Sequence, residues 1–395
     1  MRGYSVNFTS HVAPLSCRII SSIIKDKRRV CKEPKGKKTM QETGAAGPQS
    51  RPSHLAERDA FYDRLKQESM APLWEVLKGL VPPEPRPVPV AHIWRYQDLR
   101  PYLLEAAGIV SADEAERRVL VLENPALVGK SRATNTIYAG IQIVLDGEVA
   151  PAHRHVASAL RFVLESSGGY TAVAGERTTM RPGDFVITPS WAWHDHGNDS
   201  GAPIMWMDIL DLPIVNFFEC GFSEHHNDKT HSILRPEGDS LARYGAGLLP
   251  LEGHQPFGQT SPIFNYPFER TRQALVALRE GGGADPHLGY TLRYSNPLDG
   301  GWAMPTISSW MTYLPAGTST QALRSTDGIV VAVAQGRGSA MIGDKRFSFG
   351  PCDVMAVPGW TYRAFTADED CFLFCSSDRV AQEKLGLWRE ERTQR

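Results

Sequence analysis

Short apolar runs separated by glycine, proline and aspartate dominate the chain between residues 117 and 210. Each run is as long as a β-strand, and turn-forming residues follow it within a few positions. Closely spaced short strands of this kind are typical of β-sandwiches and jelly rolls. The pattern therefore predicts a jelly-roll β-barrel whose strands include residues 119–122, 137–144, 159–164, 171–173, 185–188 and 205–209.

The residues before this region have helical rather than strand periodicity. Apolar residues recur every three or four positions from Leu55 to about Val81, and Pro82-Pro83 follows them. This spacing predicts one amphipathic helix that ends at the prolines. A second helix is predicted over Tyr96–Ala107, so helices precede an otherwise all-β chain.

The strand pattern repeats at an offset of 169 or 170 residues. Gly317 matches Gly147, Gly338 matches Gly169, and the segment 351–360 resembles the segment 182–191. A repeat of this length indicates a duplicated domain, because solenoid repeats have much shorter periods. We therefore predict two copies of the same barrel in one chain.

Size and composition are those of an ordinary globular protein of about two domains, with 395 residues, 42% of them hydrophobic and 22% charged. The chain has no apolar run of membrane-spanning length, so we expect no membrane span. The predicted organisation is an N-terminal extension (1–54), a helical segment (55–112), a first barrel (113–245), a linker (246–300) and a second barrel (301–395).

The N-terminal extension is strongly basic, since residues 1–39 contain ten lysines and arginines against Asp26 and Glu33. Such a tail is found in nucleic-acid-binding proteins and in targeting peptides. However, Met40 begins a plausible protein start. We interpret the extension as disordered or as upstream sequence included by a wrong start assignment, and we expect no nucleic-acid partner.

The six cysteines form no CxxC motif, and no convincing secretory signal is present. This usage indicates a reducing compartment, for which we take the cytoplasm. Cys371 and Cys375 lie two strand repeats apart on one face, where free thiols usually serve as small buried hydrophobic groups.

Three histidines form the strongest chemical signal in the first barrel. His153 and His155 would point to the same face of a strand, and His194 follows 39 residues later. Their spacing relative to nearby glycine and proline residues resembles the two-part cupin signature. Many cupins add a carboxylate ligand shortly after the second histidine, but here Ala159 and Leu160 occupy those positions. We therefore predict a metal site with three histidine ligands.

The second barrel lacks these ligands. Alignment of the two repeats places Leu323 and Ser325 opposite His153 and His155, and it places Arg363 opposite His194. We therefore expect one metal per chain and a structural role for the second barrel.

Longer motifs around the histidines make the resemblance more specific: Pro151–His155, Ser158–Phe162, Gly175–Thr179, Pro182–Phe185, Thr188–Trp191 and Trp193–Gly197. They resemble gentisate 1,2-dioxygenases, a bicupin family that includes salicylate and 1-hydroxy-2-naphthoate dioxygenases. The resemblance implies an Fe(II) enzyme that cleaves the ring of gentisate with O2 to give maleylpyruvate. It also implies His153, His155 and His194 as iron ligands and a homotetrameric assembly.

The resemblance implies substrate-binding roles for Arg117, Tyr138, Gln142, Arg161 and His196, and catalytic roles for His196, Arg161 and Asp208. Guanidinium groups suit this task because they hold a carboxylate through paired hydrogen bonds. Arg161 shares the inward face with His155 if their strand is unbroken. We place His196 outside the coordination sphere, because a fourth ligand would close the site. Asp208 could orient His196 or accept from the substrate hydroxyl.

Three alternatives remain open at this stage. One is a salicylate or 1-hydroxy-2-naphthoate 1,2-dioxygenase, and another is a non-catalytic bicupin that binds a small acid. A zinc-dependent cupin isomerase is a third, although it would normally need a carboxylate ligand. His225, His226 and His231 are interpreted as surface residues, because their stretch is polar and lacks strand periodicity.

Overall fold

The computed structural model describes residues 53–252 and 258–393, and its contacts divide the chain into two units, one ending at Lys78 and one beginning at Gly79. The prediction for residues 1–54 falls almost wholly outside the described residues. Each unit is considered by itself below.

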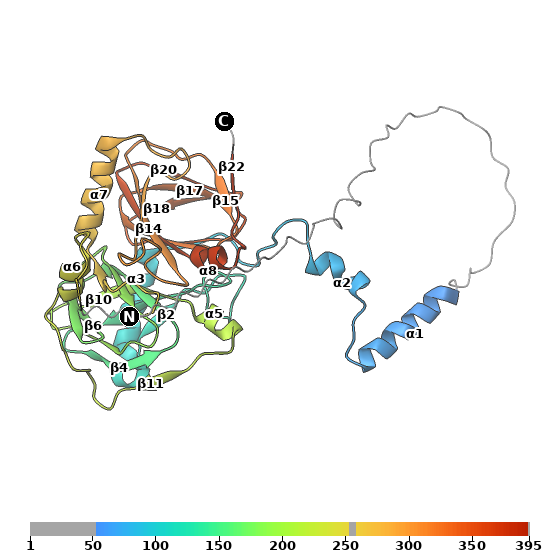
Figure 1. Cartoon of the computed structure of the whole chain (residues 1–395), viewed down its shortest axis with the longest axis horizontal. Coiled ribbons are helices and arrows are strands. Elements are labelled where there is room, and N and C mark those ends of the chain that lie inside the picture. The colour runs from blue at the N-terminus through green and yellow to red at the C-terminus, as the bar shows by residue number, and fades with distance from the viewer. Residues whose placement is uncertain (1–52, 253–257, 394–395) are drawn as a thin grey trace, which may run out of the picture. The chain divides into compact units, whose positions relative to one another are not determined.

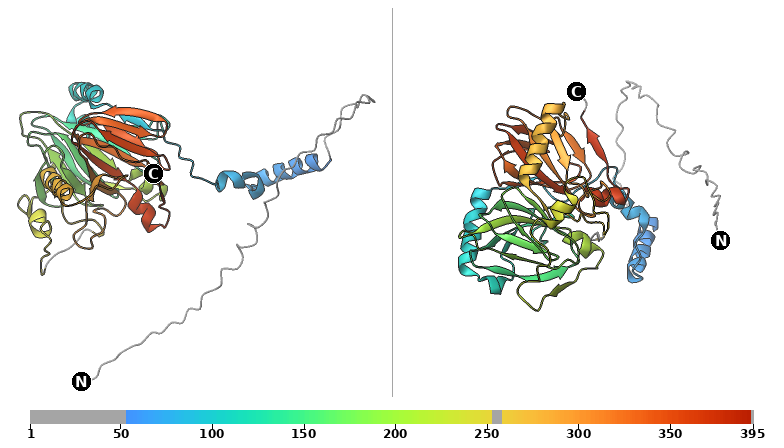
Figure 2. Two further views of the ribbon diagram at one scale, coloured as in Figure 1. Left: turned by 90° about the horizontal axis from the view of Figure 1, so that it is seen from above. Right: turned by 60° about the vertical axis from the view of Figure 1, so that its left-hand side comes forward.

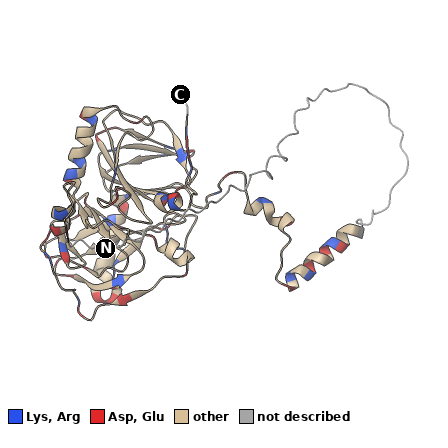
Figure 3. Ribbon diagram, viewed as in Figure 1, with Lys and Arg blue, Asp and Glu red and all other residues tan. Residues whose placement is uncertain are grey.

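The first unit contains helix α1 (Ser53–Gln67) and most of helix α2 (Leu73–Leu80), so the prediction of one continuous helix is wrong. The chain turns between them at Ser69, whose φ is 55°, and Pro72 then starts the next turn without a backbone N–H. The hydroxyl of Tyr62 donates to Glu75 at 2.7 Å and links the two helices. Basic and acidic residues are interspersed along α1 (Figure 3).

Four antiparallel sheets form the body of the second unit, and they pair into two barrels (Figure 1). In the first barrel, a six-stranded sheet has the order β12-β8-β5-β10-β3-β2, and a five-stranded sheet has the order β11-β4-β9-β6-β7. The bounds are β2 (Val119–Val121), β3 (Tyr138–Val144), β4 (Val149–His155), β5 (Ala159–Glu165), β6 (Tyr170–Val173), β7 (Glu176–Thr179), β8 (Phe185–Thr188), β9 (His194–Gly197), β10 (Ile204–Leu210), β11 (Ser223–His225) and β12 (Asn265–Tyr266).

The second barrel repeats this plan with sheets β1-β19-β16-β21-β14-β13 and β18-β17-β20-β15-β22. The predicted fold class, a bicupin of two jelly-roll barrels with N-terminal helices, is therefore confirmed. The bounds are β1 (His92–Trp94), β13 (Tyr290–Arg293), β14 (Ser308–Leu314), β15 (Leu323–Ser325), β16 (Ile329–Gln335), β17 (Gly338–Ile342), β18 (Lys345–Phe349), β19 (Val354–Val357), β20 (Arg363–Ala367), β21 (Cys371–Ser377) and β22 (Glu390–Arg392).

Helices cover the outside of the barrels, and Figure 2 shows α7 running along one side of them. The helix predicted from Tyr96 is α3 (Tyr96–Ile109). The range 246–300 is more than a linker, because β12 and β13 within it belong to different barrels. The remaining helices are α4 (Ala112–Ala115), α5 (Leu212–Phe217), α6 (Asp239–Tyr244), α7 (Phe268–Gly281) and α8 (Arg379–Lys384).

The two six-stranded sheets pack against each other and form a core that both barrels share. Successive side chains of a strand point to opposite faces. On β5, Leu160 and Phe162 face the shared core, while Arg161 and Val163 face the interior of the first barrel. Strand β5 is therefore buried on both faces. One face contributes to the core between the two barrels, and the other contributes to the cavity inside the first barrel.

Aromatic side chains fill the centre of the shared core. The rings of Phe162 in the first barrel and Phe374 in the second stack with centroids 4.4 Å apart. Tyr313 and Phe372 stack in the same core at 4.6 Å. Burial of such large side chains is a major contribution to stability, so the two barrels stabilise each other.

No described helix is both long enough and apolar enough to cross a membrane.

We predict that Phe374→Ala lowers the free energy of unfolding by about 3–5 kcal/mol, because it leaves a cavity in the shared core. Denaturant unfolding should also keep one transition for both barrels. Phe217→Ala is the matched control, since this phenylalanine is 80% exposed and its loss should change stability little. A separate early transition of the second barrel would contradict the shared core.

Candidate active site

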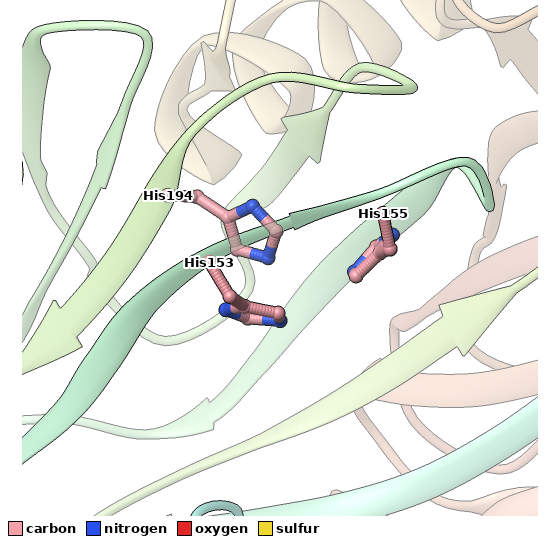
Figure 4. A group of neighbouring side chains, drawn as sticks. All are labelled: His153, His155 and His194. Atoms are coloured by element: carbon pink, nitrogen blue, oxygen red, sulfur yellow. The ribbon is translucent and has the colours of Figure 1, made fainter. Parts of the chain in front are cut away.

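The three predicted ligand histidines meet inside the first barrel. His153 and His155 end strand β4, and His194 begins the neighbouring strand β9, where it pairs with His153. Figure 4 shows the three rings turned toward one another. Ring centroids are 4.1 Å apart for His153 and His194, 4.9 Å for His155 and His194, and 5.2 Å for His153 and His155.

The rings are oriented by backbone carbonyl groups. Nδ1 of His155 lies 2.7 Å from the carbonyl oxygen of Ala157, and Nδ1 of His194 lies 2.9 Å from that of Ala192. Nε2 of His194 is buried and has no hydrogen-bond partner. One nitrogen from each of the three rings lies within 4.8 Å of the others. A buried donor set with an unpartnered nitrogen fits a bound metal ion.

Burial keeps the imidazoles in the form that binds metals. It lowers the pKa of His153 to about 2, with a further contribution from the nearby Arg117 charge. The pKa of His155 is lowered and that of His194 falls well below its usual value, again mainly through burial. Neutral imidazole is the ligand form, so these histidines need lose no proton to bind a metal.

The ligand set limits the chemistry. Among the described residues, this trio is the one cluster of histidine, cysteine and carboxylate groups that could hold a metal, and it includes no carboxylate. Imidazole suits iron, nickel, copper and zinc alike. Three protein ligands leave coordination positions open for a substrate and for O2, whereas a structural zinc site would be closed by a fourth ligand.

A cavity of about 230 Å³ opens beside the histidines. Every residue that the sequence analysis assigned to the substrate or to catalysis lines it together with the ligands. Small and aliphatic side chains complete the wall. The predicted residues are Arg117, Tyr138, Gln142, Arg161, His196 and Asp208, and the remaining wall is Val119, Ala159, Leu210 and Leu212.

Arg161 reaches the cavity by a route that differs from the prediction. The strand of His155 ends at that residue, and Arg161 lies on β5 in the opposite sheet. The assumption of one unbroken strand is therefore wrong, although the side chain does enter the same cavity. Its Nη2 lies 3.0 Å from Nε2 of His196, and its Nη1 donates to the hydroxyl of Thr188.

Asp208 is buried opposite Arg161 on the neighbouring strand β10. Its Oδ1 accepts a hydrogen bond from Nε1 of Trp206 at 2.9 Å and lies 3.5 Å from Nε of Arg161. Burial raises the pKa of this carboxyl group to about 6, against the opposing effect of the Arg161 charge. Its contact in the structure is with Arg161 rather than with His196.

His196 lies on β9 two residues beyond His194, with their ring centroids 5.8 Å apart. Its Nδ1 is buried and has no hydrogen-bond partner, and burial holds its pKa well below the usual value. His196 is thus a neutral, incompletely hydrogen-bonded ring at the cavity wall. It lies outside the cluster of three ligand nitrogens.

Three further polar groups face the cavity from the edge of the six-stranded sheet. Arg117 contacts Nδ1 of His153 and the carbonyl group of Pro151, and burial lowers its pKa to about 10. Nε2 of Gln142 is buried without a hydrogen-bond partner. Burial also raises the pKa of Tyr138 and keeps its phenol protonated. The unsatisfied buried amide of Gln142 suits contact with a ligand.

Sequence reasoning missed two residues around the site. The hydroxyl of Thr188 accepts a hydrogen bond from Arg161. Thr188 lies two residues after Val186 on β8, so the two side chains point to the same face of the strand, and this spacing could have predicted that Thr188 faces the interior. His231 is buried rather than on the surface, and its Nδ1 lies 2.5 Å from Asp195, the residue between His194 and His196. No local sequence pattern predicts this contact, because His231 and Asp195 lie far apart in the chain. His225 is exposed, as predicted.

Two barrels with one three-histidine centre define the chain as a metal-binding bicupin. The Cupin domain family model matches residues 140–210. Gentisate 1,2 dioxygenase 1 of Aquipseudomonas alcaligenes is 52% identical over 87% of this chain and 98% of that protein. The 5-aminosalicylate 1,2-dioxygenase of Comamonas sp is 34% identical over 86% of this chain and 91% of that protein.

Solved structures give the same result. The crystal structure of salicylate 1,2-dioxygenase from Pseudoaminobacter salicylatoxidans with gentisate has a TM-score of 0.82 and 33% identity, and the match covers 90% of this chain and 98% of that chain. The chain therefore belongs to the gentisate 1,2-dioxygenase family of ring-cleaving dioxygenases.

We predict that His153→Ala and His194→Ala each reduce bound metal from about one ion per chain to nearly none, because two imidazoles cannot hold it tightly. Elemental analysis of the purified variants measures this directly. His225→Ala is the matched control, because His225 pairs with His153 across the sheet but is exposed. Equal metal loss in the control would contradict the assignment of ligands.

Proposed function

We propose that this protein cleaves the aromatic ring of gentisate with O2, using Fe(II) held by His153, His155 and His194, and forms maleylpyruvate. The proposal rests on one observation: the imidazoles of the three ligand histidines and the guanidinium groups of Arg117 and Arg161 line the same cavity of about 230 Å³. A small anionic ring that chelates a metal fits such a cavity in charge and in size.

The two arginines bind the carboxylate of the acid substrate. Arg161 is buried and Arg117 is partly buried at the cavity, where a charge-assisted hydrogen bond is stronger than in water. Asp208 and Thr188 fix the guanidinium of Arg161, so its direction is set before the substrate arrives. Such preorganisation lowers the entropic cost of positioning the ring.

His196 handles hydrogen bonds and protons at the cavity wall. Its neutral ring is held at Nε2 by Arg161, and its Nδ1 has no partner within the chain. A polar group of the substrate can therefore bind there. Gln142 offers a second such contact, because its buried amide nitrogen also lacks a partner.

Held by His153, His155 and His194, Fe(II) would supply the redox chemistry that lets O2 react with an aromatic ring. In the overall reaction, the bond between the carboxyl-bearing and the adjacent hydroxyl-bearing carbon breaks, and the product retains both atoms of O2. The aliphatic wall of Leu210 and Leu212 excludes water while this bond opens.

Salicylate and 1-hydroxy-2-naphthoate are the alternative substrates. The phenol of Tyr138 lines the cavity that would receive any of these acids. Oxygen uptake with each of the three acids distinguishes them, and activity confined to salicylate or the naphthoate would overturn the gentisate assignment. Iron-loaded protein that consumes no O2 with any of them would instead support a non-catalytic acid-binding bicupin.

We also propose a compartment and an assembly state. The cysteine pattern supports a cytoplasmic enzyme, and the family resemblance supports a homotetramer. Gel filtration coupled to light scattering would test the assembly directly.

We predict that Arg161→Lys lowers kcat/KM for gentisate by about 10²–10³-fold, because an ammonium group cannot form the paired contacts of a guanidinium. Steady-state oxygen uptake measures the effect. Arg154→Lys is the matched control, because Arg154 lies between the ligand histidines but pairs with Glu224 at the barrel exterior. Its activity should stay within about threefold of wild type.

The pKa of Asp208, raised to about 6, predicts an acid limb in the pH profile. Above this pH the carboxylate is ionised and balances Arg161, whereas below it protonation frees the guanidinium and activity falls. Asp208→Asn should remove this limb from the profile of kcat/KM against pH. Asp199→Asn, at a side chain that is 72% exposed, should leave it unchanged. An unaltered limb in Asp208→Asn would show that another group titrates.

A further inference from the structure

The second barrel carries an arginine where the first barrel binds its metal. In the first barrel His153 pairs with His194 across two strands, and in the second barrel Leu323 pairs with Arg363 in the same way. The structure therefore has the repeat register that the sequence alignment indicated. Both Leu323 and Arg363 are buried inside the barrel.

Arg363 differs from the other arginines that the described part of the chain buries. Arg118 contacts the carboxylate of Glu148, and Arg161 lies 3.5 Å from that of Asp208. Among the described residues, no carboxylate oxygen lies within 4 Å of Arg363, and its one hydrogen bond runs from Nη1 to the hydroxyl of Ser325 at 3.1 Å. A buried cation without a close counter-ion lowers the stability of the folded state, so binding an anion beside Arg363 would be favourable.

The two carboxylates whose charges act on Arg363 have other partners. Asp327 is buried and its charge acts on Arg363, but Oδ1 of Asp327 accepts a hydrogen bond from Trp388 at 3.0 Å. Glu390, which also acts on Arg363 from a distance, is paired with Arg392. The other N–H groups of the guanidinium donate to no described residue, so they are open to a ligand.

Those donors line a small cavity. Its volume is about 30 Å³, and both sheets of the second barrel contribute to it, with Trp310, Thr312 and Thr320 among the lining residues. This space holds about one water molecule or one monatomic ion. It is far smaller than the 230 Å³ cavity of the first barrel and excludes an aromatic acid.

We propose that the second barrel binds one small inorganic anion, of the size of chloride, against the guanidinium of Arg363. The anion supplies the charge that the described chain does not place within ion-pair distance. Ser325 holds the guanidinium in position, and the surrounding apolar side chains strengthen the attraction by excluding water. The duplicated barrel thus exchanges a cation site for an anion site and stabilises the fold.

Thermal unfolding of the metal-loaded full-length protein tests the proposal. Replacing sodium gluconate with sodium chloride at a constant 0.5 M, roughly a saturating concentration for such a site, should raise the Tm by about 3–5 °C. Arg363→Met should abolish the difference between the two salts. Arg324→Met, in which the neighbouring outward arginine that pairs with Glu391 is replaced, should keep it. Equal Tm values of wild type in both salts would overturn the proposal.

Crystals soaked in sodium bromide provide a test that does not depend on any variant. An anomalous scattering peak beside the guanidinium of Arg363 is expected. A water molecule at that position, or Asp327 turned to within ion-pair distance of Arg363, would show instead that the charge is balanced without an anion.

Discussion

The arrangement of charge in the first barrel governs the rest of the structure. Six basic side chains line the cavity, and Asp208 is the one carboxylate among its lining residues. Burial disfavours the charged form of each imidazole, and the positive charges of Arg117 and Arg161 repel an added proton. Protonation of the ligand histidines is therefore unfavourable. The histidines therefore stay neutral and available to a metal. The remaining positive charge attracts an anionic substrate, so ligand chemistry and substrate choice follow from the same electrostatic constraint.

The six-stranded sheet of the first barrel connects this site to global stability. On β5 the side chains that face outward build the core shared with the second barrel, while those that face inward include Arg161. The same alternation holds on β3, where Ile141 faces the shared core and Gln142 the cavity. A site on strands that are buried on both faces is held more rigidly than a site on loops.

Local patterns predicted the elements and the ligands. His153, His155 and His194 could be found because a strand has a period of two and the duplicated barrel offered a register for comparison. Contacts between distant segments could not be found in this way. The anchoring of His231 by Asp195 and the approach of Arg161 from the opposite sheet both depend on how strands are ordered in space. The break between α1 and α2 was missed because the apolar spacing continues across Pro72.

Strand β1 is synthesised long before the strand with which it pairs. It lies ahead of the entire first barrel, yet it pairs with β19 in the second, and the backbone N–H of Tyr96 donates to Asp353 beside it. A ribosome must add about 260 residues after β1 before its partner strand exists, which takes on the order of ten seconds to a minute. The second barrel therefore cannot complete its sheet from its own stretch of chain. The whole of the first barrel, through β12, is therefore synthesised before the partner strand of β1 exists.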